Sequence, residues 1–342
     1  MENSDLLRRL PKAELHLHIE GSLEPAHLMQ LAQKNKVAIP FKTVEEVQAA
    51  YQFTRLQDFL DIYYQGMSVL LEEEDFYALT MAYLRRVAQD GAVHAEIFYD
   101  PQGHTDRGIP FAAATDGILR GLKDGEAELG ITSRLILCFL RHLSEEAGFA
   151  TYREAEPYFA DGRLLGVGLD SSEMGHPPEK FERLFAAARA DGLKVVAHAG
   201  EEGPPEYVRS ALDILRIDRM DHGNRSLEDP ELIARLAKSG MTLTVCPLSN
   251  LKLCVVPDLE AHPLKRMLDL GLQATVNSDD PSYFGGYLLD NYVAVAEALN
   301  LTELDLVKLV CHSIEGSFLD QADKARHLAK IDSLVAAETQ SA

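Results

Sequence analysis

Two histidines near the start of the chain, His16 and His18, are the side chains whose type and spacing point most clearly to chemistry. They alternate with Leu15, Leu17 and Ile19, which is the pattern of a β-strand with one apolar face. Because successive side chains of a strand point to opposite faces, both imidazoles point the same way and can reach one metal ion. The alternative is a pair of polar residues on an exposed strand.

Further candidate ligands lie at the ends of other apolar runs. His198 ends one such run, and Asp279 follows the last of them. Three histidines and one carboxylate (His16, His18, His198 and Asp279) form a donor set that suits a single Zn²⁺ ion with one further position for water. An ion of this kind lowers the pKa of its bound water towards about 7. The sequence therefore predicts a mononuclear zinc site.

Three more polar residues lie next to these candidate ligands in the sequence. Glu201 is three residues after His198 and is placed to exchange a proton with a substrate, although an acid there also favours a helix N-terminus. His222 would lie beside the metal-bound water as an orienting base, and the alternative is a hydrogen-bonded core histidine. Asp280 could hydrogen-bond a substrate, although an aspartate before a proline is also typical of a turn.

Eight short apolar runs recur along the chain, and these are the expected strands. They span residues 14–19, 93–99, 134–139, 165–170, 194–198, 219–222, 242–246 and 273–277. Amphipathic helical patterns lie between them, at residues 178–191, 205–215, 229–239 and 259–270. Glycines that are typical of a helix C-cap end several of these patterns: Gly192, Gly240 and Gly271.

Eight β-then-α units predict a closed parallel (β/α)8 barrel, the TIM barrel of the α/β class, as a single domain over residues 1–342. An open doubly wound sheet is the alternative, but the chain has no glycine-rich phosphate loop to support it. Catalytic residues of such a barrel stand at the carboxyl ends of the strands, which is where the candidate ligands fall. The segment 22–91, between the first two runs, is expected to be a helical insert that covers the barrel mouth.

The acidic composition limits the kinds of partner. The 342 residues include 54 acidic and 33 basic side chains, which gives a net charge of −21. Such a surface repels phosphate backbones and argues against a nucleic-acid partner. No apolar run reaches the roughly 18 residues of a membrane span, the first ten residues lack a signal-peptide pattern, and the four cysteines show no CxxC spacing. We therefore expect a cytoplasmic protein with a small-molecule substrate and no membrane partner, while assembly into a homo-oligomer stays open.

An ordered set of segments resembles the adenosine/adenine deaminase family of the amidohydrolase superfamily over nearly the full chain. The matching segments are residues 11–18, 59–63, 140–142, 198–201, 221–223, 246–250 and 277–281. The resemblance implies that the three histidines and Asp279 bind zinc, that Glu201 protonates N1 of a purine ring, that His222 orients and deprotonates the attacking water, and that Asp280 hydrogen-bonds N7. Binuclear relatives use a lysine on the fourth strand, and residues 164–170 contain none, which favours one ion per chain.

Two departures from the adenosine-specific members bear on the substrate. Where those members have an aspartate that reaches the ribose, this chain has the longer Glu20, and where they have a glycine after the fourth strand it has Ser171. Both changes resemble the adenine deaminase branch, which implies hydrolysis of adenine to hypoxanthine and ammonia in purine salvage. Glu20 would then accept a hydrogen bond from an imidazole N–H of the free base. Adenosine and N6-substituted adenines are the alternative substrates.

Overall fold

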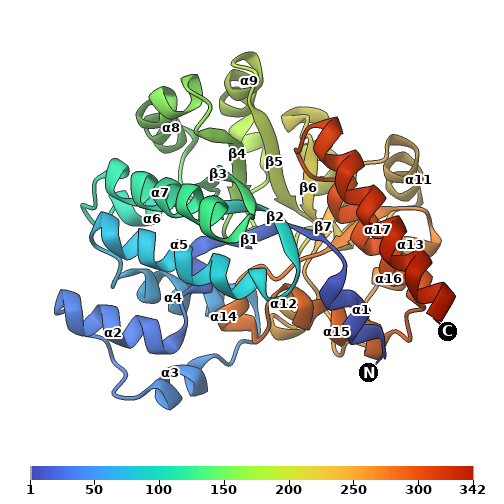
Figure 1. Ribbon diagram of the computed structural model, residues 1–342. Helices are drawn as coiled ribbons and strands as arrows, with labels where there is room; N and C mark the ends of the chain where they lie inside the picture. Colours follow the sequence, from blue (N-terminus) through green and yellow to red (C-terminus); the bar gives the residue numbers. More distant parts are fainter. Residues whose placement is uncertain (1, 342) are drawn as a thin grey trace.

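Eight parallel strands form the centre of the molecule, and helices surround them (Figure 1). The computed structural model describes residues 2–341. The strands pair in sequence order, as expected for a (β/α)8 barrel. They are β1 (Lys12–His18), β2 (Ala92–Tyr99), β3 (Thr132–Leu140), β4 (Leu164–Asp170), β5 (Lys194–Ala199), β6 (Arg219–His222), β7 (Thr242–Val245) and β8 (Gln273–Val276).

The predicted TIM barrel is therefore confirmed, and each expected strand lies within two residues of an observed one at both ends. Helices follow the strands on the outside of the barrel (Figure 1). Outside the first crossover they are α1 (Glu2–Arg9), α6 (Pro101–Thr105), α7 (Phe111–Leu129), α8 (Glu145–Ala160), α9 (Glu182–Ala190), α10 (Pro205–Ser210), α11 (Pro230–Ser239), α12 (Pro247–Lys252), α13 (Leu264–Asp269), α14 (Pro281–Phe284), α15 (Leu288–Ala298), α16 (Glu303–Glu315) and α17 (Gln321–Ser341).

Three expected helices begin or end differently from their sequence patterns. The helix expected over 259–270 begins only at Leu264, because Pro263 occupies its N-cap and proline disfavours helical backbone in the residue before it. The pattern at 178–191 starts as a 3₁₀ turn, Pro178–Phe181, before α9. The pattern at 205–215 ends in a π-helical turn, Ala211–Leu215. The three expected C-cap glycines all have the left-handed backbone that this position requires.

The crossover from β1 to β2 is a helical segment whose inner face contributes to the mouth of the barrel. It contains a 3₁₀ turn, Ile19–Ser22, and four helices. Leu56, Phe59 and Leu60 line the cavity at the carboxyl ends of the strands. The four helices are α2 (Pro25–Asn35), α3 (Val44–Ala50), α4 (Leu56–Met67) and α5 (Glu73–Ala88).

The barrel closes where β8 meets β1, and this seam holds two candidate ligand regions together. The N–H of His18 donates to the carbonyl of Asp279 at 3.0 Å, and the N–H of Asp279 donates to the carbonyl of His16 at 3.0 Å. Further down the seam, the side chain of Asn277 accepts the N–H of Leu15 at 2.9 Å. The strand that carries the two histidines is therefore tied by its backbone to Asp279.

A buried arginine joins β4 to β5 at the other side of the barrel, where these strands pair over only two residue pairs. The N–H of Arg141 donates to the carbonyl of Asp170 at 3.1 Å, and its Nη1 donates to the carbonyl of His198 at 2.7 Å. The backbone of Arg141 is thereby bonded to β4 and its side chain to β5, which links the two strands beyond their short ladder. Among the described residues, no helix has the length and apolar character that crossing a membrane requires.

Candidate active site

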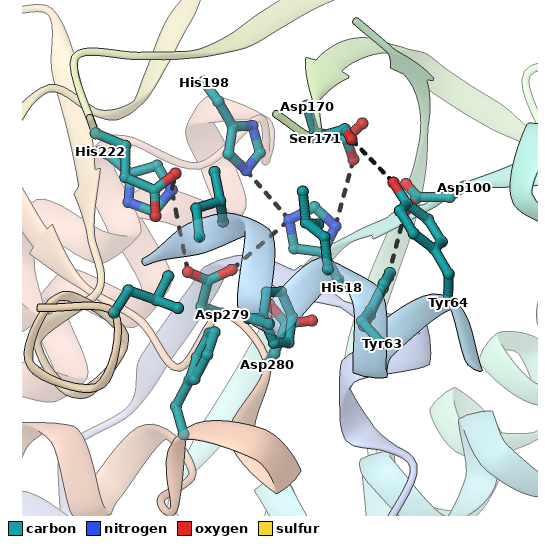
Figure 2. Close-up of a pocket in the computed structure, with 16 residues that line it drawn as sticks. His18, Tyr63, Tyr64, Asp100, Asp170, Ser171, His198, His222, Asp279 and Asp280 are labelled. Carbon is teal, nitrogen blue, oxygen red and sulfur yellow. Dashed lines mark hydrogen bonds and ion pairs between the residues drawn. The ribbon is translucent and has the colours of Figure 1, made fainter. Parts of the chain in front are cut away.

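Four buried side chains from three strand ends converge at the carboxyl side of the barrel. Figure 2 labels three of them, His18, His198 and Asp279. One donor atom from each of His16, His18, His198 and Asp279 lies within 4.8 Å of the others. The Nε2 atoms of His18 and His198 are 3.1 Å apart, and Asp279 Oδ1 lies 3.3 Å from His16 Nε2. The structure thus brings together all four residues that the sequence singled out as metal ligands.

The outer nitrogens of these imidazoles face oxygen atoms. His16 Nδ1 lies 2.8 Å from the hydroxyl of Thr244, which donates to Asp221 Oδ1 at 2.9 Å. The other oxygen of Asp221 lies 3.8 Å from His198 Nδ1. An oxygen at 2.8 Å from Nδ1 fixes the tautomer that presents Nε2 to a metal ion. The Thr244 hydroxyl, itself bonded to Asp221, therefore orients His16.

The donor set fits a cation rather than a network of internal hydrogen bonds. His16 Nε2 is buried and has no hydrogen-bond partner among the described residues. Burial and the neighbouring imidazoles push the pKa of His198 well below its usual range, so its ring is neutral and free to bind a metal. Burial alone would raise the pKa of Asp279, but His16, His222 and His18 hold it well below its usual range. Neutral imidazoles with one carboxylate are the ligands that Zn²⁺ takes in hydrolytic sites.

Two residues at the metal end of the site have strained backbone. Asp279 and His222 both have φ of 64°, in the left-handed region that non-glycine residues rarely adopt. Each stands where a strand ends, so the turn aims its side chain towards the centre of the barrel mouth. His222 Nε2 then lies 4.0 Å from Asp279 Oδ2.

A glutamate and a histidine lie beside the cluster, on the same cavity (Figure 2 labels His222). Glu201 Oε2 is 3.6 Å from His222 Nε2, and both side chains are buried. Burial, with Asp279 as the next cause, raises the pKa of Glu201 well above its usual range. Burial and His16 lower the pKa of His222 to about 3. A carboxyl with a raised pKa therefore stands next to an imidazole with a lowered pKa, which is the pairing that acid–base catalysis needs.

The loop that carries Glu201 is held by the carboxylate of Glu173. Four consecutive backbone N–H groups donate to it, from Gly200 at 2.7 Å, Glu201 at 3.1 Å, Glu202 at 2.9 Å and Gly203 at 2.7 Å. Gly203 has no room for a side chain, because a Cβ there would lie 2.5 Å from Glu173 Oε1. The buried carboxylate thus sets the path of the loop.

Asp280 lies at the metal cluster, and its position depends on a glycine. It is the N-cap of α14, yet its side chain makes no capping bond, so the role of turn former does not occupy the carboxylate. The side chain lines the cavity, and Oδ1 has no partner among the described residues. A Cβ at Gly21 would lie 1.9 Å from Asp280 Oδ1. Only glycine at position 21 therefore allows this placement.

The far end of the cavity is formed by carboxylates and tyrosines. Asp100 and Asp170 stand at the ends of β2 and β4, and Tyr63 and Tyr64 extend from α4 (Figure 2). Ser171, with φ of 72°, also lines this end. Its hydroxyl is 2.9 Å from the Tyr64 hydroxyl, which joins the insert to the β4 loop.

Glu20, a predicted substrate contact, is not among the residues that line this cavity. Its Oε1 accepts the N–H of Asp100 at 3.1 Å and lies 2.9 Å from His104 Nε2. Its other oxygen lies 3.4 Å from the Tyr63 hydroxyl. Glu20 therefore stands behind the cavity wall and holds residues that form it.

Sequence reasoning assigned no role to several residues that shape the site. Asp100 and Asp170 end strands, which is the signal that could have found them. Tyr64 belongs to an amphipathic helix and looks like any partly buried aromatic residue. Glu173 lies in a loop with no regular pattern, and no local signal identifies its four hydrogen bonds.

A (β/α)8 barrel with three histidines and an aspartate at the carboxyl ends of its strands defines an enzyme of the amidohydrolase superfamily. The family model described as adenosine deaminase matches residues 11–334. The chain therefore belongs to the adenosine deaminase family, and it is a hydrolase that acts on C–N bonds. The predicted family resemblance is confirmed.

Relatives cover nearly the whole chain. An adenine deaminase of Sphingopyxis alaskensis is 66% identical over 97% of this chain and 96% of its own length. The crystal structure of an adenine deaminase from Arthrobacter aurescens has a TM-score of 0.93 at 44% identity, covering 95% of this chain and 99% of that one. An amidohydrolase from Burkholderia ambifaria, crystallised with bound zinc, has a TM-score of 0.89 at 29% identity, covering 98% and 94%.

Proposed function

We propose that this protein catalyses the zinc-dependent hydrolysis of adenine to hypoxanthine and ammonia. The observation that carries the proposal is the position of Glu201 and His222, which share a cavity with three members of the four-residue cluster, His18, His198 and Asp279. The likeness to two proteins named adenine deaminase supports adenine as the substrate. Purine salvage in the cytoplasm is the physiological setting that we infer for this reaction.

We assign one Zn²⁺ ion to His16, His18, His198 and Asp279. The unpartnered Nε2 of His16 and the facing Nε2 atoms of His18 and His198 support this assignment. When bound, such an ion supplies Lewis acidity and lowers the pKa of a coordinated water towards about 7. Zinc in the Burkholderia ambifaria relative is consistent with this choice of metal.

Glu201 is the proton donor in the proposed mechanism. Addition of water at C6 breaks the conjugation of the purine ring, and protonation of N1 makes C6 more electrophilic. The raised pKa of Glu201 supports this role, because a carboxyl that is still protonated near neutral pH can give its proton to N1.

His222 and Asp280 complete the proposed set of reacting and orienting groups. His222, neutral and 3.6 Å from Glu201, accepts a proton from the attacking water and orients it. Asp280 binds N7, for which its free carboxyl oxygen and its position on the cavity are suited. Burial, with Asp279 as the next cause, raises the pKa of Asp280 well above its usual range, so a protonated carboxyl can donate to N7.

A panel of purines tests the proposed function. Ammonia release from adenine, adenosine and N6-methyladenine should be measured on purified protein of known metal content. We expect adenine to have the highest kcat/KM and activity to follow zinc content. Faster release from adenosine would contradict the choice of the free base, and release that is independent of bound metal would contradict the mechanism.

A further inference from the structure

We propose that Asp100 and Asp170 form an acceptor pair for the imidazole N–H of a free purine base and thereby select the base over its nucleoside. This inference rests on the proposed function, because it concerns how the same cavity recognises its substrate. Asp100 and Asp170 line the cavity and can reach the N–H directly, whereas Glu20 lies behind the cavity wall.

The two carboxylates lie together at one end of the cavity. Asp100 is 3% exposed and Asp170 is 2% exposed, and both line the cavity. One oxygen from each lies within 4.8 Å of a ring nitrogen of His18 and of the other carboxylate. Figure 2 shows the pair on the side of His18 that faces away from Asp279 and His222. A purine ring in this cavity therefore has its reacting edge near Asp279 and His222 and its opposite edge near the two carboxylates.

The protein leaves acceptors of this pair without donors. The Tyr63 hydroxyl donates to Asp100 Oδ2 at 3.3 Å, and His18 Nδ1 lies 3.5 Å from Asp170 Oδ2. Asp100 Oδ1 and Asp170 Oδ1 have no hydrogen-bond partner among the described residues. Asp100 is the N-cap of α6, yet its side chain makes no capping bond. Because a buried acceptor that is left without a donor costs free energy, a donor on the ligand is the expected partner.

A free adenine supplies such a donor, and adenosine does not. The base carries N–H at N9, whereas in the nucleoside N9 is bonded to the sugar. The wall near Asp170 is closed by the contact of 2.9 Å between the Tyr64 and Ser171 hydroxyls, and His142 Nδ1 lies 3.0 Å from the same serine. A sugar on N9 would remove the donor and press against this wall.

The competing occupant is a second cation, because His18, Asp100 and Asp170 also have the composition of a metal site. Metal analysis separates the two cases. The acceptor pair predicts one ion per chain in the wild-type protein and in Asp100→Asn. Two ions per chain in the wild type, falling to one in Asp100→Asn, would overturn the proposal.

The main test compares wild type, Asp100→Asn and Asp170→Asn with adenine and 9-methyladenine as substrates. Because an amide is a weaker acceptor than a carboxylate and presents an NH₂ group in place of one oxygen, we expect kcat/KM for adenine to fall about 10-fold in both variants. The value for 9-methyladenine, which has no N–H to donate, should change much less. Asp106→Asn removes an exposed charge six residues from Asp100 and should leave both values unchanged.

Binding gives a readout that does not depend on turnover. Titration calorimetry with the product hypoxanthine and with 9-methylhypoxanthine should show weaker binding of hypoxanthine in Asp100→Asn by the same factor. Thermal unfolding confirms that each variant is folded, and Asp100→Asn is the main variant because Asp170 also lies next to His18.

The outcomes distinguish this inference from the proposed function. If the wild type releases no ammonia from adenine, the proposed function fails and this inference falls with it. If the wild type deaminates adenine but both folded variants retain its kcat/KM and its hypoxanthine affinity, only the acceptor pair is overturned.

Discussion

The carboxylate of Glu173 accepts the backbone N–H of Glu201 at 3.1 Å, so one buried acid holds the main chain of another. The same carboxylate binds the N–H groups on either side, at Gly200 and Glu202. The side chain of Glu201 is thereby presented to the cavity while its backbone is fixed. We regard Glu173 as a positioning residue, because it acts on the reaction through Glu201.

Glu173→Gln should therefore lower both stability and turnover. An amide offers one acceptor oxygen and places an NH₂ group against backbone N–H donors, so we expect a loss of about 2–3 kcal/mol in the free energy of unfolding. We expect kcat to fall more than KM rises, together with a changed pH profile. Glu182→Gln, an exposed change nine residues further along, is the matched control. A variant with a lower melting temperature but unchanged kcat and pH profile would reduce Glu173 to a structural role.

Glu201→Gln should retain the metal and lose nearly all turnover. Glu201 is outside the four-residue cluster, and an amide cannot supply the acidic proton, so kcat should fall about 10²- to 10⁴-fold. Metal content and ammonia release from adenine are the measurements. Full activity in a metal-loaded variant would remove Glu201 as the acid.

The pH dependence should show loss of activity on the alkaline side. The pKa of Glu201 is raised, so its carboxyl is protonated below that pKa and loses the proton as pH rises through it. Turnover that needs this proton falls in the same range. The neighbouring Glu202 also has a raised pKa, chiefly because of burial, so Glu202→Gln is the control. If Glu202→Gln removes the alkaline decline, the acid has been assigned to the wrong residue.

Removal of the metal should abolish activity and lower the melting temperature. Four buried donors lose their common partner, and a ligand present at 1,000 times its Kd stabilises the folded state by about 4 kcal/mol. Dialysis against a chelator, followed by thermal unfolding with and without added Zn²⁺, measures this effect. An apoprotein with the melting temperature of the holoenzyme would argue against metal binding at these residues.

Gly21→Ala should displace Asp280 without removing the metal. The new Cβ would lie 1.9 Å from Asp280 Oδ1, so the carboxylate has to move. A misplacement of about 1 Å at a reacting group can cost on the order of 100-fold in rate. Asp280→Asn should give a similar loss of kcat/KM with normal metal content. If Gly21→Ala is fully active, Asp280 does not act from the position seen here.

The fold could be predicted because its strands are apolar runs that end in polar residues. The same feature predicted that His198 and Asp279 lie close together, since strand ends of a barrel meet at one rim. What the sequence could not show is backbone geometry. The left-handed φ of His222 and Asp279 depends on the tertiary structure, and nothing in the residue types reveals it.

Hydrogen bonds between residues far apart in the sequence explain why other contacts in the site could not be predicted. Glu20 is predicted to contact substrate, and the structure adds that its carboxylate lies against His104, which is 84 residues away in the sequence. Asp100 precedes a proline and resembles a turn former, and only the structure shows that its side chain caps nothing. The residue types indicate what chemistry these acids can do, but only the structure shows which groups they contact.

The cavity is built from two separate portions of the chain. The strand ends supply His18, His198 and Asp279, while the insert between β1 and β2 supplies the apolar and tyrosine wall of α4. Changes in α4 can therefore alter which heterocycle fits without disturbing the groups that react. Evolution can therefore change the substrate of such a barrel by altering the insert between β1 and β2 alone. For the same reason, α4 is the place to begin a redesign of specificity.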